Sequence, residues 1–351
     1  MEALDHKCPS CGAKITFHPK EQKWVCDYCG SKFTLEEMQK YQNASSESVN
    51  QKKAPKKEVK VEEADVYRCK SCGAEIVADS NTTATFCVYC GNTAILKERI
   101  QNSRVPDLII PFQKVKNDAV KAFEGVVKHK PLVPKAFKRK ENINKITGIY
   151  IPFWAYDFDV SGTANFNAKD VHSWSDTTFH YTKTDTFMTE VEGHMHYDKV
   201  LADGSSRFPD ALMDSLEPFQ YKDLIPYNHA FLSGFLAEKF DVLEDTAIER
   251  AKERTMNTSV SLLQEEVRHQ TSMLASNNLT VNKADSDYIM LPVFMVNIKY
   301  RDKMYTFAMN GQTGKIVGDL PLGRKEVILW TLLILVLSSL VFILLFIGGI
   351  I

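Results

Sequence analysis

CPSC at residues 8–11 and CDYC at residues 26–29 form a first set of C-x-x-C motifs, and CKSC at 69–72 and CVYC at 87–90 form a second. These motifs contain all 8 cysteines of the 351-residue chain, and their spacing is the same in both sets. Two thiolate pairs at this spacing bind a tetrahedral Zn²⁺ and leave no coordination position open, so each set predicts a structural zinc site. The predicted ligands are Cys8, Cys11, Cys26 and Cys29 for one Zn²⁺, and Cys69, Cys72, Cys87 and Cys90 for the other.

Short strand-like stretches between the motifs predict a zinc ribbon, which is a β-hairpin with a metal-binding turn at each end. These stretches are residues 14–17 and 23–26 in the first set, and 75–77 and 83–86 in the second. A glycine follows each motif and allows the positive φ of a sharp turn: Gly12, Gly30, Gly73 and Gly91. A ribbon of about thirty residues buries little core, so zinc binding supplies folding free energy. A disulfide framework is the alternative, but nothing else in the sequence indicates secretion.

The C-terminal stretch 327–351 has no charged residue and consists mainly of Val, Ile, Leu and Phe. It is long enough to cross the ~30 Å hydrocarbon core of a bilayer as a helix. Trp330 has the position of an interfacial aromatic residue, and Arg324 and Lys325 precede the stretch. By the positive-inside rule the rest of the chain is cytoplasmic, and the polar N-terminus predicts no signal sequence. We therefore expect a single-pass protein of the cell membrane with a C-terminal tail anchor.

The predicted fold class is multidomain, with two small β zinc ribbons, an α+β domain with an antiparallel sheet, and one C-terminal transmembrane helix. Ribbon 1 includes a short helix that begins at Thr34, where Glu37 completes a capping box. The polar, lysine-rich segment after it predicts a flexible linker. The predicted boundaries are 1–42 for ribbon 1 with its helix, 43–65 for the linker, 66–98 for ribbon 2, 99–323 for the α+β domain and 326–351 for the anchor.

Hydrophobic periodicity outlines the α+β domain. Apolar positions recur with helical spacing over 115–129, and a longer helix capped by Asp241 is expected to reach about His269. Alternation of apolar and polar residues predicts half-buried, antiparallel strands. The expected strands are 108–112, 149–167, 179–197, 288–300, 304–309 and 315–317.

A basic patch follows the first of these helices and comprises Lys128, Lys130, Lys135, Lys138, Arg139 and Lys140. It is a solvated loop, a contact for anionic phospholipid, or a contact for nucleic acid. The whole chain has 43 basic and 44 acidic residues, which gives no general sign of a nucleic-acid binder. Ribbon 1 is mildly basic and offers Trp24 and Tyr28 for stacking, whereas ribbon 2 has balanced charge. We therefore favour protein contacts for the ribbons, and lipid or partner contact for the patch.

The sequence HMHYD at 194–198 is similar to the start of a metallo-β-lactamase metal site, but Lys199 stands where that motif continues with histidine. On a strand, His194 and His196 share one face with Glu190 and Glu192 whatever their function. This arrangement predicts a solvent-exposed strand face and leaves open a weak accessory metal site.

Several further stretches carry a resemblance that covers nearly the whole chain: YIPFW at 150–154, LSGFLAEK at 232–239 and NGQTGK at 310–315. Together with the double C-x-x-C ribbons and the apolar tail, they resemble the TFIIB-type zinc-ribbon membrane proteins of Gram-positive bacteria, the YdjG-like proteins. This resemblance implies a role in envelope stress beside a phage-shock-protein-A-like partner at the membrane. It also implies that all eight cysteines are metal ligands.

We therefore expect a membrane-anchored, non-enzymatic zinc-ribbon adaptor that binds a protein partner at the cytoplasmic face. One alternative is a membrane-tethered, nucleic-acid-binding regulator, which needs Lys20, Lys23 and Trp24 for its contacts. Another is a metal-dependent hydrolase in the α+β domain, which needs a second metal at His194 and His196. No motif of a known catalytic site supports this last alternative.

Overall fold

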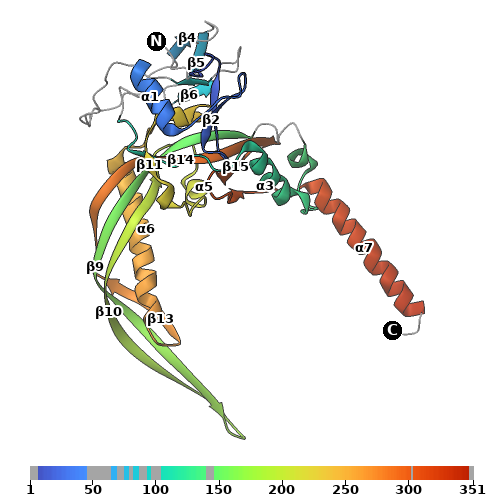
Figure 1. The fold of residues 1–351 in the computed structure, drawn as a ribbon. Coiled ribbons are helices and arrows are strands. Elements are labelled where there is room, and N and C mark those ends of the chain that lie inside the picture. Colours follow the sequence, from blue (N-terminus) through green and yellow to red (C-terminus); the bar gives the residue numbers. More distant parts are fainter. Residues whose placement is uncertain are drawn as a thin grey trace.

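The computed structural model describes residues 7–45, 65–68, 75–78, 82–86, 93–95, 104–139, 146–301 and 303–347. Its body contains several antiparallel strand pairs and a large curled sheet, from which a long β arm and a C-terminal helix project (Figure 1). Three sheets are present in these residues: one of 3 strands, one of 2 strands and one of 11 strands. The chain is thus multidomain in character, with one apolar helix at its C-terminal end.

Ribbon 1 forms the three-stranded sheet. Its strands β1 (Ile15–His18) and β2 (Lys23–Cys26) pair antiparallel as predicted, and β3 (Lys32–Phe33) pairs with β2. Helix α1 (Leu35–Ser45) follows. The predicted capping box is present, because the Thr34 backbone N–H donates to Glu37 Oε2 at 2.7 Å and the Glu37 backbone N–H donates to Thr34 Oγ1 at 3.4 Å.

The strands around the second set of cysteines pair differently from the prediction. Strand β4 (Asp65–Arg68) pairs with β5 (Glu75–Ala78) in the two-stranded sheet, and β6 (Thr82–Phe86) pairs with β7 (Thr93–Ile95). The expected pairing of 75–77 with 83–86 is therefore wrong, because those stretches lie in different sheets. Strand β6 also pairs with β12 (Leu236–Glu238), which places it in the sheet of the α+β domain.

Two very long strands dominate the large sheet. Strand β9 (Thr147–Ser175) has 29 residues and pairs antiparallel with β10 (His180–Asp203) on one side and with β14 (Thr280–Tyr300) on the other. The prediction ended β9 at residue 167, but pairing with β10 continues to Ser175, because the cross-strand hydrogen bonds need no buried face. The remaining strands are β8 (Leu108–Ile109), β11 (Ile225–Pro226), β13 (Thr271–Asn277), β15 (Lys303–Asn310) and β16 (Ile316–Gly318).

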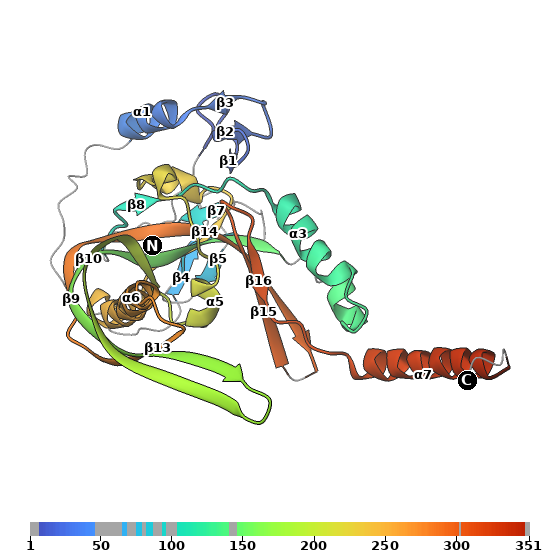
Figure 2. The same cartoon turned by 90° about the horizontal axis from the view of Figure 1, so that it is seen from below.

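The sheet is antiparallel as predicted except at two pairings, β12 with β9 and β14 with β8, which are parallel. Helix α6 (Glu244–Glu265) lies within the curl of the sheet, as Figure 2 shows from below. Its Leu263 packs in a buried cluster with Val160, Ala164 and Phe166 of β9. The predicted cap Asp241 instead accepts hydrogen bonds from the backbone N–H and hydroxyl of Ser206, so α6 begins later than expected.

Helix α3 (Lys116–Lys128) covers the opposite end of the sheet, and its Phe123 ring lies 5.1 Å from that of Phe307 on β15. Short 3₁₀ turns η1 (Lys135–Lys138), η2 (Tyr221–Asp223) and η3 (His229–Leu232) and helix α5 (Asp210–Asp214) complete the body. The C-terminal helix α7 (Arg324–Ile347) projects away from the body (Figure 1). Its stretch Arg324–Leu345 is long and apolar enough to cross a membrane, and its most apolar part buries nothing against the protein.

Candidate metal centre

The four cysteines of ribbon 1 converge at the ends of the β1–β2 hairpin. The Cys8 and Cys29 sulfurs lie 3.6 Å apart, as do those of Cys11 and Cys26, and all four Sγ atoms lie within 4.8 Å of one another. A tetrahedral Zn²⁺ with bonds of about 2.3 Å requires sulfurs about 3.8 Å apart, whereas a disulfide requires about 2.05 Å. The four thiols are free, and their spacing fits a single metal ion.

The backbone explains why the sulfurs converge. Gly12 and Gly30 have φ values of 75° and 72°, which confirms the sharp turns predicted after both motifs. The N–H of Gly12 donates to the Cys8 carbonyl at 2.8 Å, and the N–H of Gly30 donates to the Cys26 carbonyl at 2.9 Å. Each turn is thereby closed around its own pair of thiols, with the same geometry on both sides of the site.

The electrostatics of the cluster favour a cation. Hydrogen bonds with the Ser31 side chain and backbone lower the pKa of Cys29 to about 6. At Cys11 a backbone hydrogen bond from Ala13 acts in the same direction, but desolvation and the neighbouring thiols outweigh it and raise the pKa to about 12. Cys29 is therefore readily deprotonated, whereas Cys11 holds its proton until a divalent cation neutralises the charge of the cluster, so metal binding there releases a proton. Cys8, Cys11, Cys26 and Cys29 are compatible with zinc.

The second predicted site, formed by Cys69, Cys72, Cys87 and Cys90, lies outside the described residues, as do Gly73 and Gly91. Strands β4 and β5 flank its first motif, and strands β6 and β7 flank its second. Among the residues that the structure describes, the cluster in ribbon 1 is the one group of metal-binding side chains close enough to share an ion.

Ribbon 1 is packed against the α+β domain through Trp24. The indole is fully buried, its Nε1 donates to the Ala230 carbonyl at 2.9 Å, and its ring lies 5.0 Å from that of Phe17 and 4.9 Å from that of Phe231. The Phe17 backbone N–H also donates to the Ser233 carbonyl at 3.1 Å. The expectation that Trp24 is free to stack on nucleic acid is therefore wrong, whereas Tyr28 is 83% exposed.

The histidines of β10 lie on the exposed strand face, as predicted. The ring nitrogens of His196 lie 2.7 Å from Asp159 Oδ1 and 3.0 Å from Asp198 Oδ1. The Asp159 carboxylate, assisted by that of Asp198, raises the pKa of His196 above its usual range. His194 is exposed, and within the described part of the chain it belongs to no cluster suited to a metal. His196 is thus engaged by carboxylates in an arrangement that favours its protonated form.

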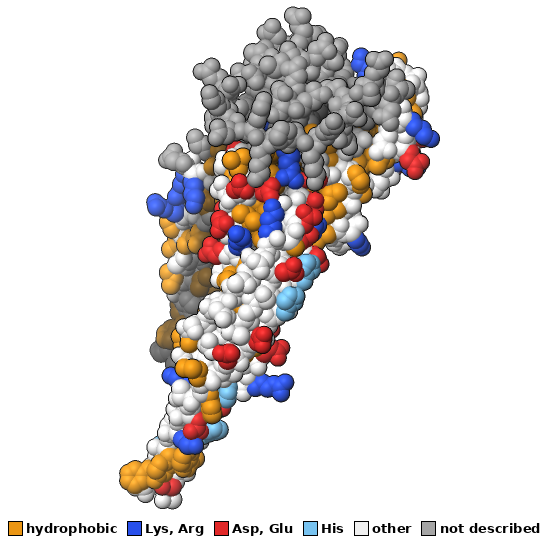
Figure 3. Space-filling view, turned by 90° about the vertical axis from the view of Figure 1, so that its left-hand side faces the viewer, with side chains coloured by type: hydrophobic (Ala, Val, Ile, Leu, Met, Phe, Trp, Pro, Cys, Tyr) orange, Lys and Arg blue, Asp and Glu red, His pale blue; other side chains and the backbone are white. Residues whose placement is uncertain are grey.

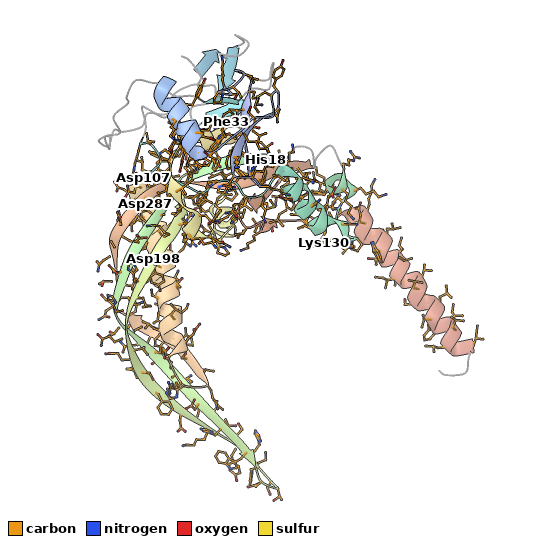
Figure 4. The ribbon with its side chains drawn as sticks, in the orientation of Figure 1. His18, Phe33, Asp107, Lys130, Asp198 and Asp287 are labelled. Atoms are coloured by element: carbon orange, nitrogen blue, oxygen red, sulfur yellow. The ribbon has the colours of Figure 1, made fainter. Side chains whose placement is uncertain are left out.

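The basic patch lies beside the first turn of α7. The Gly323 backbone N–H, just before α7, donates to the Leu132 carbonyl at 2.8 Å, and Phe137 in η1 packs against Tyr300 and Tyr305 at ring distances of 5.9 and 5.5 Å. Figure 4 labels Lys130 at this position. The contacts bring two further segments to the patch, namely the hairpin end between β14 and β15 and the start of α7.

We call the assembled surface the basic collar. No carboxylate of the described residues lies within ion-pair distance of its members. Arg301 and Lys303 are far from the patch along the chain, so no local pattern predicts them as members, and the packing of Phe137 brings their hairpin near it. Lys140 of the predicted patch lies outside the described residues. The collar consists of Lys128, Lys130, Lys135, Lys138, Arg139, Arg301, Lys303, Arg324 and Lys325.

Comparison with known proteins places the chain in a family. It is 33% identical over 328 residues to a Bacillus subtilis (strain 168) protein named "Uncharacterized protein YdjG", and the match covers 93% of each chain. No family model matches the chain, and no solved structure matches it. A match of this identity over almost the full length of both proteins means that the chain belongs to the YdjG family.

Proposed function

We propose that this protein is a non-enzymatic zinc-ribbon adaptor that is anchored in the cell membrane and binds a protein partner at its cytoplasmic face. The observation that carries the proposal is the exposed apolar surface of α7. Its 22-residue stretch Arg324–Leu345 measures about 33 Å at 1.5 Å per residue, which matches a hydrocarbon core of about 30 Å. Arg324 and Lys325 at its start favour a cytoplasmic body.

Two structural Zn²⁺ ions belong to this proposal. The four sulfurs of ribbon 1 lie close enough to supply all four ligands of a tetrahedral Zn²⁺, which would leave no coordination position for a substrate and supports a structural metal. The repeated motif supports the same role for Cys69, Cys72, Cys87 and Cys90. Metal in such a site replaces the core that a small ribbon lacks.

The exposed turn of ribbon 1 that carries Tyr28 offers a surface for a partner. Trp24 secures one side of the ribbon to the domain, while Tyr28, between two cysteines, is 83% exposed. Because the ribbon is already packed in place, a partner that contacts Tyr28 need not immobilise it on binding. We propose that this partner is a phage-shock-protein-A-like protein acting in envelope stress, as the resemblance implies.

The basic collar supports the same placement at the membrane. Its members lie on segments beside or at the start of α7, where the chain meets the inner leaflet if α7 is inserted. Each Lys or Arg near an anionic leaflet contributes about 1 kcal/mol of attraction. We propose that the collar contacts anionic phospholipid and helps to hold the body against the membrane.

The test uses the full chain in nanodiscs that contain phosphatidylglycerol, with a purified phage-shock-protein-A-like protein as the second component. We expect saturable binding that Tyr28→Asp weakens at least about tenfold, or by about 1.4 kcal/mol. Lys252→Glu, a change of charge on α6, serves as the matched control and keeps wild-type affinity. The adaptor proposal would be contradicted if the wild-type chain did not bind, or if Lys252→Glu lost as much affinity as Tyr28→Asp.

Metal analysis of the same preparation tests the non-enzymatic part. We expect two zinc ions per chain, and the same number in the His194→Ala/His196→Ala variant. A third metal that this variant loses would overturn the proposal and indicate chemistry in the α+β domain.

A further inference from the structure

The far end of the β9–β10 arm stands apart from the rest of the molecule. Strand β13 supports the arm only as far as Lys169, which pairs with Thr271, and Gln270 contacts the next two residues. We call residues 172–183 the arm tip. Within the described residues, the side chains of the arm tip make hydrogen bonds and ring contacts only among themselves, apart from the ion pair of Lys183 with Asp185 further along β10. An isolated two-stranded ribbon is marginally stable in water, so an unsupported arm tip indicates a surface that meets something else.

Three exposed aromatic rings gather on the arm tip. Trp174 and Tyr181 are directly opposite each other on the two strands and stack with ring centroids 5.6 Å apart at 14°. Phe179 meets Tyr181 edge to face at 6.3 Å. Their exposed fractions are 52% for Trp174, 62% for Phe179 and 39% for Tyr181. Figure 3 shows hydrophobic side chains at the extreme end of the arm, with basic and histidine side chains just behind them.

The turn that presents these rings is held in one shape by Asp176. Its Oδ1 accepts hydrogen bonds from the backbone N–H groups of Thr178 and Phe179, both at 2.7 Å, and its Oδ2 accepts one from the Tyr181 hydroxyl at 2.9 Å. The turn is thereby ordered while its rings remain in solvent. Such preorganisation reduces the entropy that binding would cost.

The shape of the molecule indicates what the arm tip meets. The arm leaves the body, curves, and returns toward the side on which α7 projects (Figures 1 and 2). A plane drawn through the arm tip and the first turn of α7 in Figure 1 has the body on one side and α7 on the other. A bilayer that receives α7 therefore passes close to the arm tip, and Lys130 of the basic collar lies near the start of α7 (Figure 4).

We propose that the arm tip lies in the lipid headgroup layer of the membrane that anchors α7, as a second contact remote from the anchor. This inference rests on the proposed insertion of α7. Trp and Tyr concentrate at the membrane interface, because their rings are apolar and their N–H and O–H groups remain hydrated. Lys183 and His172 form an opposed pair behind the rings, and Lys183, whose Nζ also lies 3.0 Å from Asp185 Oδ2, adds a positive charge there for lipid phosphates. With contacts at both ends, the body is fixed in orientation above the bilayer.

Tryptophan fluorescence tests both contacts in one protein. The chain has 4 tryptophans, of which Trp24 and Trp154 are buried. Full-length Trp330→Phe leaves Trp174 to report on the arm tip, Trp174→Phe leaves Trp330 to report on α7, and the double variant gives the buried background. Each variant is reconstituted at low density into phosphatidylcholine–phosphatidylglycerol vesicles, with lipids brominated near the headgroup or deep in the acyl chain.

We expect bromines near the headgroup to quench Trp174 several-fold more than the buried background, and Phe179→Asp to reduce that quenching. Quenching of Trp330 without quenching of Trp174 would overturn this inference and leave the anchor intact. Absence of quenching at both positions would overturn the anchor and this inference together. Protection of Trp174 from a water-soluble quencher without quenching by brominated lipid would place the arm tip on a protein, such as a second copy, and would also overturn the inference.

Discussion

Trp24 connects ribbon 1 to the α+β domain, so replacing it tests whether the two parts open together. The indole is fully buried, donates to the Ala230 carbonyl at 2.9 Å and lies 4.9 Å from the Phe231 ring. Replacing a buried Trp with Ala costs about 3–5 kcal/mol. Since each 1.4 kcal/mol is a factor of ten, a loss of about 3 kcal/mol raises amide exchange through local opening by roughly 100-fold.

Hydrogen exchange of the zinc-loaded full chain in nanodiscs, followed by mass spectrometry, measures this opening. We expect Trp24→Ala to accelerate exchange both in β1–β2 and in η3, which lies on the domain side. Phe231→Ala should do the same from the other side of the contact without altering the ribbon itself. Tyr28→Ala is the matched control, because this ring lies on the same ribbon and is 83% exposed.

A double-mutant cycle separates the contact from general loss of stability. Aromatic pairs contribute about 0.5–1.5 kcal/mol beyond their buried area, so Trp24→Ala and Phe231→Ala should be non-additive by about that amount. Additive losses of stability in the double variant would refute a cooperative contact. Faster exchange in β1–β2 without faster exchange in η3 would refute it as well. The ribbon would then be an independent unit that only rests on the domain.

Three further outcomes are expected. Arg250 pairs with the buried Asp203 carboxylate at 2.6 Å, so Arg250→Ala should lower the free energy of unfolding by about 3–5 kcal/mol in chemical denaturation. Lys252→Ala, at a half-exposed position of the same helix, should change it by less than about 0.5 kcal/mol. Zinc chelation should unfold β1–β2 and accelerate exchange in η3; a ribbon that stays protected without metal would contradict this. Asp159→Asn should lower the pKa of His196 in an NMR titration. Because the pKa of His196 is raised in the folded state, the His196–Asp159 pair stabilises the fold fully below about pH 6.5 and loses that contribution as the pH rises through the folded pKa. An unchanged pKa in the Asp159→Asn variant would show that Asp159 does not cause the shift.

The structure corrects the sequence analysis where distant segments compete for the same strand or surface. Strand β6 was expected within ribbon 2, but it pairs with β12 because the edge of a larger sheet offers it further backbone hydrogen bonds. Trp24 was expected to be exposed enough to stack on nucleic acid, because it lies in a mildly basic ribbon. Its actual environment is made by Ala230 and Phe231, more than 200 residues later in the chain.

The sequence by itself determined the features that depend on local spacing. A C-x-x-C pair followed by glycine specifies a turn around two thiols, and the geometry at Gly12 and Gly30 follows from the preference of glycine for positive φ. An uncharged stretch of sufficient length specifies a helix able to cross a bilayer wherever it occurs. Both rules operate within a few residues of the chain, so no knowledge of the fold is needed to apply them.

Only the tertiary structure decided how these parts are placed. The contact of ribbon 1 with the domain and the assembly of the basic collar join residues that are far apart in sequence, and the curvature of the β9–β10 arm turns its tip toward the side on which α7 projects. Such contacts depend on the register of long strands and on side-chain packing across the curled sheet, which a local pattern leaves undetermined. Spacing therefore predicts a metal-binding turn and an apolar helix, while packing determines which surfaces they leave free.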